Sequence, residues 1–252
     1  MVSVTFFGTS SAIPSKERGF ACIGVESQDD LILLDCGDGS LRNILKMGID
    51  AGKISNILIT HFHSDHLTGL TQIVEAMGIK RRETELNVFG LAGLNEYFST
   101  VEKITSVAFN RKFKINLNEI TPDQRIQVGS FRVSTFEMAH MIPCIGYRIE
   151  SEGKVISYTG DTEPCTGTVS LGKDADLFIH EATFLRKDIA KARQSKHSLP
   201  SEAADNAKSA GAKELVLTHV TDSAEKEDEM LGESSSIFKN TRVAHDGMEF
   251  SL

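Results

Sequence analysis

Short apolar runs separated by polar turns dominate the first part of the chain, and this pattern predicts β-strands. Residues 31–34 are apolar at every position, which is typical of a strand covered on both faces. The polar residues 27–30 predict a hairpin connection in front of that strand. The strands predicted in this part of the chain are residues 2–7, 20–26, 31–35, 57–59 and 85–89.

Helical spacing of apolar residues appears in four places. One helix is expected after the turn at residues 35–39 and runs through Met47, and another covers residues 91–101. A third runs from Leu67 to Met77, with Gly78 as its expected end. The alanine-rich residues 200–211 predict a helix with proline in its first turn and glycine at its end. Between residues 102 and 127 the pattern weakens and predicts no element.

In the second half of the chain, predicted strands are followed directly by histidine, aspartate or glutamate residues, which can bind metals or transfer protons. Residues 147–150 and 155–158 predict a hairpin turned at 151–153. A fold that places such strand ends on one rim gathers dispersed side chains into one site. The residues that follow a predicted strand in this way are His61, His140, Asp161, Glu181 and His219. We therefore expect an α/β fold with two sheets packed face to face between helical layers.

The composition is that of a globular protein with a substantial core. The chain has 252 residues, of which 40% are hydrophobic and 25% charged, and no apolar run is long enough for a membrane span. The N-terminus carries no basic segment, so we expect no signal peptide, one domain over residues 1–252, a cytoplasmic location and no membrane partner. The net charge of −8 means that any RNA contact needs a local basic patch.

The four cysteines are widely scattered and form no C-x-x-C pair. This spacing favours a reducing compartment and argues against a thiolate zinc site.

The stretch from His61 to His66 places three histidines and one aspartate within six positions, directly after a predicted strand. His61 and His63 are two residues apart, so in an extended segment their rings point the same way. Asp65 and His66 lie at the turn into the following helix and can face a second point nearby. Imidazole and carboxylate ligands suit Zn²⁺ or a similar borderline metal, so the stretch predicts a metal site.

Motifs along almost the whole chain resemble those of the ribonuclease Z family, within the metallo-β-lactamase superfamily. The histidine stretch is typical of the superfamily, and residues 180–184 with His197 narrow the resemblance to ribonuclease Z. The other segments that carry it are Thr5-Phe6-Phe7-Gly8-Thr9-Ser10, Leu34-Asp35-Cys36-Gly37-Asp38-Gly39, Pro143-Cys144-Ile145-Gly146-Tyr147-Arg148, Tyr158-Thr159-Gly160-Asp161-Thr162 and Leu217-Thr218-His219. The resemblance implies a four-layer αββα sandwich of two mixed β-sheets flanked by helices.

The resemblance also implies a function: a zinc-dependent endonuclease that cleaves the 3′ trailer from precursor tRNA, in a family whose members are commonly homodimers. It implies two Zn²⁺ ions, with Mn²⁺ or Fe²⁺ as alternatives. Two such cations about 3.5–4 Å apart can share a hydroxide that attacks phosphorus. By resemblance, the first zinc is held by His61, His63 and His140, the second by Asp65, His66 and His219, and Asp161 bridges the two.

Further roles follow from the same motifs. His197 is expected to protonate the departing ribose oxygen, with Glu181 holding its tautomer, and Asp65 also orients the nucleophile. We expect Asp35 to brace the ligand loop by hydrogen bonds and His180 to support the site from behind. His245 is assigned to structure or solvent, and the basic residues 80–82 and 111–114 to solvated faces.

The chain departs from the family pattern in three places. The long arm that relatives insert between the third and fourth motifs is absent, because only about a dozen residues separate Tyr147 from Asp161. Residues 220–223 replace a Ser-Arg-Tyr stretch, with Asp222 adding a negative charge, and Gly19 stands where asparagine is usual. The alternatives are therefore a phosphodiesterase of small or cyclic diesters, a non-catalytic metal-holding RNA-binding protein, and a di-iron redox protein.

Overall fold

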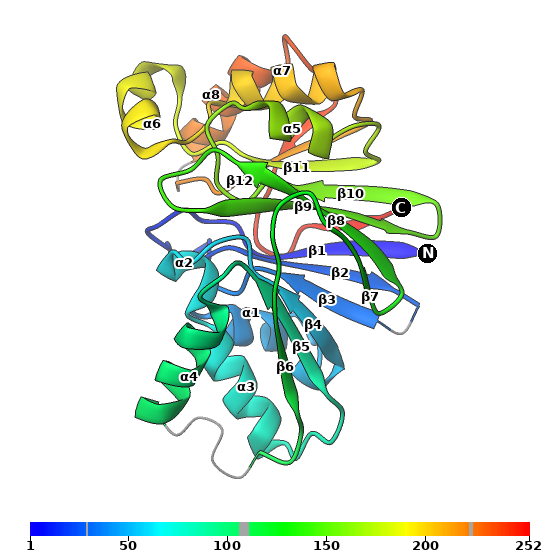
Figure 1. The fold of residues 1–252 in the computed structure, drawn as a ribbon. Helices are drawn as coiled ribbons and strands as arrows, with labels where there is room; N and C mark the ends of the chain where they lie inside the picture. The colour runs from blue at the N-terminus through cyan, green and yellow to red at the C-terminus, as the bar shows by residue number, and fades with distance from the viewer. Residues whose placement is uncertain (29, 106–110, 222–223) are drawn as a thin grey trace.

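Two seven-stranded β-sheets pack face to face, and helices cover the outer face of each (Figure 1). The structure is a computed structural model that describes residues 1–28, 30–105, 111–221 and 224–252. Both sheets contain parallel and antiparallel pairs. The predicted αββα sandwich of two mixed sheets is therefore confirmed.

The first sheet comes from the N-terminal half of the chain and one C-terminal strand. Its strand order is β14-β1-β2-β3-β4-β5-β6. The pairs β3–β4, β4–β5 and β5–β6 are parallel, whereas the pairs on the β1 side are antiparallel. The strands are β1 (Val2–Gly8), β2 (Cys22–Ser27), β3 (Asp30–Leu34), β4 (Ile54–Leu58), β5 (Leu86–Gly90), β6 (Ile115–Glu119) and β14 (Glu249–Ser251).

The second sheet has the order β13-β12-β11-β10-β9-β8-β7. Its β10 to β13 side is parallel, and its β7 to β10 side is antiparallel. The strands are β7 (Arg125–Val128), β8 (Phe131–Met138), β9 (Cys144–Ser151), β10 (Lys154–Tyr158), β11 (Leu177–Glu181), β12 (Leu215–Thr218) and β13 (Thr241–Val243).

The helices form the two outer layers. In Figure 1, α1, α3 and α4 lie against the first sheet, and α5, α7 and α8 lie against the second. The helices are α1 (Ser40–Lys46), α2 (Ser64–Leu67), α3 (Leu70–Ile79), α4 (Leu94–Thr105), α5 (Thr166–Leu171), α6 (Ile189–Ser195), α7 (Pro200–Ala210) and α8 (Ala224–Ser234), with the short 3₁₀ helices η1 (Ala51–Lys53) and η2 (Arg186–Asp188). None of the helices in the described ranges combines the length and apolarity that crossing a bilayer requires.

The largest apolar cluster lies between the two sheets, and each helical layer forms a further cluster with its own sheet. Strand β8 shows how the sequence directs this packing. Phe131, Val133 and Thr135 are buried on its inner face, whereas Arg132 between them is exposed. Residues 31–34 are buried at every position, as their apolar pattern predicts, because sheet and helices cover both faces of β3.

The sheets are joined at the edge where the polar residues follow the strands. Tyr147 of β9 donates a hydrogen bond from its hydroxyl to the backbone oxygen of Ile59, at 2.7 Å. The amide of Ile145 donates to the backbone oxygen of Thr60, at 3.1 Å. These bonds hold the segment before His61 against the second sheet, so the ends of β4 and β10 face one another.

Some elements differ from the sequence prediction. The helix expected from Leu67 to Met77 is interrupted: Leu67 ends α2, a separate helix α3 begins at Leu70, and α3 continues through Gly78 to Ile79. The break falls at Gly69, where a Cβ atom would lie 2.1 Å from the backbone oxygen of Gly37. The described parts of residues 102–127, which exclude 106–110, contain the end of α4, the strand β6 and most of β7. Pairing with neighbouring strands compensates here for a weak local pattern.

Two sequence predictions fall partly on residues that are not described. The hairpin connection 27–30 includes Asp29, and the replaced family stretch 220–223 includes Asp222 and Ser223; these three residues lie outside the described ranges.

Replacing Tyr147 with phenylalanine should lower the free energy of unfolding by about 1–3 kcal/mol, because the buried Ile59 carbonyl loses its side-chain hydrogen-bond donor. Urea denaturation of the wild-type and Tyr147→Phe proteins measures this difference. Equal stability of the two proteins would show that the contact between the sheets does not depend on this bond.

Candidate metal centre

The seven predicted ligand side chains meet at one edge of the sandwich, beside α2. His61 and His63 come from the loop after β4, and Asp65 and His66 come from α2. The other three ligands lie beyond the ends of β8, β10 and β12. They are His140, Asp161 and His219. Sequence reasoning therefore named a set of residues that the fold does bring together.

The first group of ligand atoms consists of three ring nitrogens and one carboxylate oxygen. Nδ1 of His63 lies 3.1 Å from Nε2 of His61 and 3.1 Å from Nε2 of His140. Oδ2 of Asp161 lies 3.7 and 3.8 Å from the Nε2 atoms of His61 and His140. Ligands of a tetrahedral zinc with bonds of about 2.0–2.1 Å lie about 3.3–3.4 Å apart, so the spacing fits one cation.

The second group shares Asp161 with the first. Nε2 of His219 lies 3.3 Å from Oδ2 of Asp65 and 3.5 Å from Oδ2 of Asp161. Nε2 of His66 lies 3.5 Å from Oδ1 of Asp161 and 3.7 Å from Oδ2 of Asp65. A second cation would fit here, and the Asp161 carboxylate is placed to contact both.

Two buried atoms in this region have no hydrogen-bond partner in the described structure. They are Nε2 of His66 and Oδ1 of Asp161, and they face one another across the second group. Buried polar atoms are almost always paired, so two unpaired atoms aimed at one point indicate a missing partner. A divalent cation bound between them would satisfy both atoms, and the donor set suits zinc.

The electrostatics of the site suit a cation. Burial opposes ionisation of Asp65, but the His219 hydrogen bond and nearby histidines lower its pKa to about 2. Burial also opposes ionisation of Asp161, yet His219, His66 and His61 hold its pKa well below the usual range. Both carboxylates are therefore charged at neutral pH.

The histidines differ in protonation. Burial lowers the pKa of His61, His63 and His140, which keeps a lone pair free for a metal. For His66, burial opposes the charge, but Asp161 and Asp35 raise the pKa well above its ordinary value. A cation at Nε2 of His66 would replace that proton as the positive partner of the two carboxylates.

Asp35 orients the ligand loop from behind. Its fully buried carboxylate accepts hydrogen bonds from the backbone amide and hydroxyl of Thr60, from Nδ1 of His66 at 2.7 Å and from the hydroxyl of Tyr158 at 2.9 Å. The bond to His66 leaves Nε2 of that ring facing the site. This is the bracing role that the sequence analysis assigned to Asp35.

Other ligands are held in the same way. Nδ1 of His140 donates to the backbone oxygen of Lys196 at 3.1 Å, and Nδ1 of His219 lies 2.8 Å from the hydroxyl of Thr183. Partners of this kind fix the tautomer and the direction of a metal-binding ring.

The backbone at the site adopts conformations that constrain its sequence. His219 has φ of 57° and Asp35 has φ of 58°, both in the left-handed region that few non-glycine residues occupy. Gly160 has φ of 61°, and a Cβ atom there would lie 2.8 Å from Cβ of Thr60. The close contact between the β10–α5 loop and the histidine loop therefore requires glycine.

Glu181 and His197 form a pair at the rim. Oε1 of Glu181 lies 2.8 Å from Nδ1 of His197, whose ring stacks on His219 at a centroid distance of 5.4 Å. Burial lowers the pKa of His197, but the Glu181 charge and hydrogen bond outweigh this and raise it to about 9. The ring is therefore protonated at neutral pH, and it lies beside Asp161 and His219.

Thr183 is a residue that sequence reasoning did not single out. Its hydroxyl lies 2.9 Å from Oε2 of Glu181, 2.8 Å from Nδ1 of His219 and 3.3 Å from Nδ1 of His197. It thus connects a predicted ligand with the Glu181–His197 pair. Its place within the motif at residues 180–184 was the available signal, but only the fold shows which rings it reaches.

The remaining histidines lie outside the ligand groups. His180 is fully buried, with Nδ1 2.7 Å from the backbone oxygen of Glu181 and Nε2 3.0 Å from Asn206. His245 is exposed, and its ring contacts the backbone of Asp246.

The comparisons with known proteins agree with this geometry. Residues 31–220 match the model of the Beta-lactamase superfamily domain. The ribonuclease Z of Methanothermobacter thermautotrophicus is 30% identical, with 98% of this chain and 96% of that protein covered. The chain belongs to the ribonuclease Z family of the β-lactamase superfamily.

Solved structures give the same result. The human tRNase Z short form (ELAC1) superposes with a TM-score of 0.85 at 29% identity, covering 99% of each chain. The metallo-β-lactamase fold protein YhfI from Bacillus subtilis has a TM-score of 0.86 over 99% of this chain and 98% of its own, at 24% identity, which shows the shared fold alone. As a member of this family, the protein is a metal-dependent hydrolase whose His/Asp groups suit divalent metal ions.

The family relationship also shows what this chain lacks. The match to the Methanothermobacter protein extends over 296 positions, 44 more than the 252 residues present here. That relative therefore carries at least 44 residues without a counterpart. The third and fourth motifs of this chain are joined by the short hairpin of β9 and β10, which turns at Glu152 and Gly153.

Replacing Asp35 with alanine should lower the affinity for the second metal ion by about 10- to 100-fold, since His66 loses the acceptor that holds its ring. Titration with Zn²⁺ in the presence of a competing chelator measures this. Asp38→Ala, an exposed aspartate in the same turn, serves as the matched control. Unchanged affinity in Asp35→Ala would contradict the bracing role.

Proposed function

We propose that this protein is a dizinc ribonuclease Z that cleaves the 3′ trailer from precursor tRNA, acting as one hydrolase domain over residues 1–252. The proposal rests on one observation above all. The Asp161 carboxylate lies within 3.8 Å of ring nitrogens of both groups of ligand atoms, and a hydrogen-bonded Glu181–His197 pair lies beside them. The relatives of this chain, a ribonuclease Z and a tRNase Z, indicate the substrate.

His61, His63 and His140 would hold one zinc ion, Asp65, His66 and His219 the other, and Asp161 would bridge them. Two such cations supply Lewis acidity and a nucleophile at neutral pH. Zinc is preferred over Mn²⁺ or Fe²⁺ because five imidazoles and two carboxylates suit a borderline metal, although the donor set also admits those ions.

Each remaining polar side chain then has a separate task. Oδ2 of Asp65 lies among the ligand atoms of the second group, 3.3 Å from Nε2 of His219, so its other oxygen is free to take a proton from the attacking water and to orient it. Nδ1 of His197 donates to Glu181, which leaves the Nε2 proton available to the departing 3′ oxygen of the ribose. Without this proton the leaving group would depart as a high-energy alkoxide.

Glu181 itself stays ionised. Burial disfavours its charge, but His197 lowers the pKa of the carboxyl. Oε1 also accepts from the amides of Thr162 and Ser198, at 3.0 and 3.2 Å. These bonds fix the carboxylate on the β11 side of the site, so that it aligns His197 and does not itself reach into the metal groups.

The homodimer implied by the resemblance stays a prediction, and so does the cytoplasmic location expected from the N-terminus and the cysteine pattern. A phosphodiesterase of small diesters is the second candidate, favoured by the tight β9–β10 turn between the two motifs where the family resemblance implies a long arm. A non-catalytic RNA-binding protein would have no use for the Glu181–His197 pair, so the geometry favours an enzyme.

The decisive experiment is mapping of the cleavage site on a purified precursor tRNA that carries a 3′ trailer, with Zn²⁺ supplied. We expect one cut that leaves a 3′ hydroxyl on the tRNA, and no cut with Asp65→Ala. Efficient hydrolysis of a chromogenic diester without any cut in the RNA would contradict the proposed substrate and favour the small-diester alternative.

The acid role of His197 predicts a dependence on the leaving group. His197→Ala should lower kcat on RNA by about 10²- to 10⁴-fold, because the ribose oxygen needs a proton, with metal content unchanged. The same variant should hydrolyse a p-nitrophenyl phosphodiester at nearly the wild-type rate, since nitrophenolate leaves without protonation.

His245→Ala, an exposed histidine outside the site, is the control and should match the wild type on both substrates. An equal loss of rate on both substrates in His197→Ala would assign the residue to structure or metal binding instead.

A further inference from the structure

The outer face of the second sheet is only partly covered by helices. α7 and α8 pack against β11, β12 and β13, and α5 packs against one end of β8 and β9, so the outer face of β7 and of the remaining parts of β8 and β9 lies beyond α5 (Figure 1). Strand alternation sends Arg132, Ser134 and Phe136 of β8 to this open face. Cross-strand pairing places Arg125 and Arg148 on either side of Ser134.

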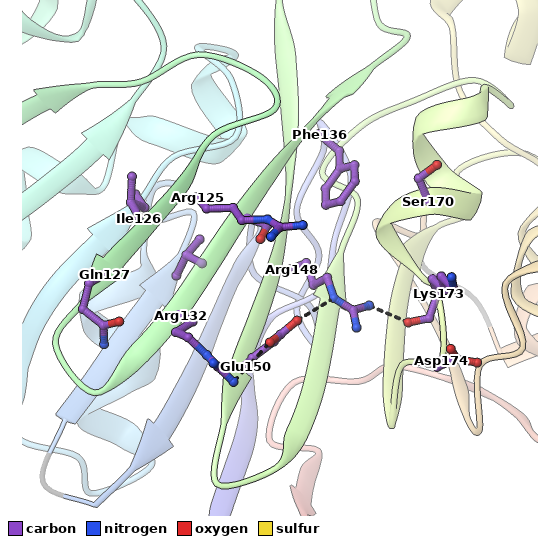
Figure 2. A pocket seen from close by; sticks show the side chains of 12 residues that line it. Arg125, Ile126, Gln127, Arg132, Phe136, Arg148, Glu150, Ser170, Lys173 and Asp174 are labelled. Carbon is purple, nitrogen blue, oxygen red and sulfur yellow. Dashed lines mark hydrogen bonds and ion pairs between the residues drawn. The ribbon is translucent and has the colours of Figure 1, made fainter.

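These side chains line a hollow of about 650 Å³, bounded on the opposite side by the end of α5 and the residues after it. We call it the arginine groove, and Figure 2 shows its lining side chains, with Phe136 at one end. Its charged members are four cations and two carboxylates: Arg125, Arg132, Arg148, Lys173, Glu150 and Asp174. This local excess of positive charge contrasts with the net charge of −8 of the whole chain.

The contacts within the groove leave two cations available. Glu150 pairs with Arg148 at 3.0 Å and with Arg132 at 3.5 Å. Within the described part of the chain, Arg125 and Lys173 have no ion-pair partner. Their charged groups are exposed, so an anion in the groove can reach both without breaking an existing contact.

Arg148 makes the groove a fixed structure. Its Nη1 donates to the backbone oxygens of Leu171, the last residue of α5, and of Lys173, just after the helix. The side chain is only 17% exposed, so it ties the β9 wall of the groove to the opposite wall. Phe136 adds an aromatic surface on which a nucleic-acid base could stack.

Two further hollows connect the groove with the metal centre. The adjoining hollow shares Phe136 and Ser170 with the groove. The next one shares Met138 and its neighbours with that hollow and is lined by His140 itself. A substrate that extends from the metal centre along β8 would therefore pass over a series of hollows that share lining residues.

The distance between the arginine groove and the metal centre is short enough for one RNA molecule to contact both. Ser134, which lies between Arg125 and Arg148, is six residues before His140. At about 3.3 Å per residue this is roughly 20 Å, less than one turn of a nucleic-acid duplex at about 34 Å. The middle hollow contains Asp123 and Glu137, so the phosphate contacts would be concentrated at the groove and would not run along the whole path.

We propose that the arginine groove binds the phosphate backbone of the RNA substrate several nucleotides from the bond that is cut. This inference rests on the proposed function and names the part of the surface that recognises the RNA. It places RNA binding on the second sheet, beside the short β9–β10 hairpin, in a chain that does not have the long arm of its relatives.

The test is the double variant Arg125→Glu/Lys173→Glu, assayed on precursor tRNA over a range of salt concentrations. Neither side chain has an ion-pair partner in the described structure, so folding should be unaffected. We expect KM to rise about tenfold or more with kcat unchanged, because substrate and transition state lose the contact equally. The slope of log KM against log salt should fall by about 0.7–0.9 for each lost phosphate contact.

Three controls accompany this variant. Lys103→Glu/Lys114→Glu makes the same change in net charge at exposed positions near α4 and β6, and should leave KM and the salt slope unchanged. Arg125→Lys/Lys173→Arg retains both charges and should restore binding. All variants should hydrolyse a p-nitrophenyl phosphodiester like the wild type, since that substrate is too small to reach the groove.

Wild-type KM and salt slope in Arg125→Glu/Lys173→Glu would overturn the inference, and so would an equal effect in the Lys103→Glu/Lys114→Glu control. Failure of the proposed function gives a different result, because the wild type itself would not cut the RNA. In that case fluorescence anisotropy with the same tRNA decides the matter, and equal affinity of the wild type and the groove variant would refute RNA binding there.

Discussion

The buried carboxylate of Asp35 is the interaction on which the rest of the site depends. It joins the first sheet, through its own position after β3, to the histidine loop through Thr60 and His66, and to the second sheet through Tyr158. A buried carboxylate is stable only when its oxygens are hydrogen-bonded. Moving any of these donors away would therefore leave the buried Asp35 charge without a partner. The two sheets therefore cannot shift against each other without exposing an unpaired charge.

In the rest of the metal centre, too, each buried carboxylate is stabilised by neighbouring polar groups. Asp65, Asp161 and Glu181 are all buried, and each is matched by histidines rather than by lysine or arginine. Histidine can serve two functions in one site, because a neutral ring can bind a metal ion and a protonated ring can donate a proton. The environment decides between the two, with burial dominating around His61 and the Glu181 carboxylate dominating around His197.

Sequence patterns predicted most of this because the relevant signals are local. Residues 147–150 and 155–158 form the paired strands of a hairpin as predicted, and Asp161, which follows the second of them, reaches the site. The pattern failed where tertiary contacts decide. The edge strands β6 and β7 have weak patterns, and α2 and α3 are separated because the chain passes close to Gly37. Thr183 and the arginine groove depend on residues far apart in sequence, so no local signal reveals them.

The separation of the groove from the centre has an electrostatic consequence. At physiological ionic strength the screening length is about 8 Å, well below the roughly 20 Å between them along β8. The carboxylates of the centre and the overall negative charge therefore do not cancel the field of Arg125 and Lys173. Such an enzyme can combine an acidic chain, which resists indiscriminate binding to nucleic acids, with a local cationic contact. Affinity for RNA would then be salt-dependent at the groove, while the chemistry in the buried centre would be much less so.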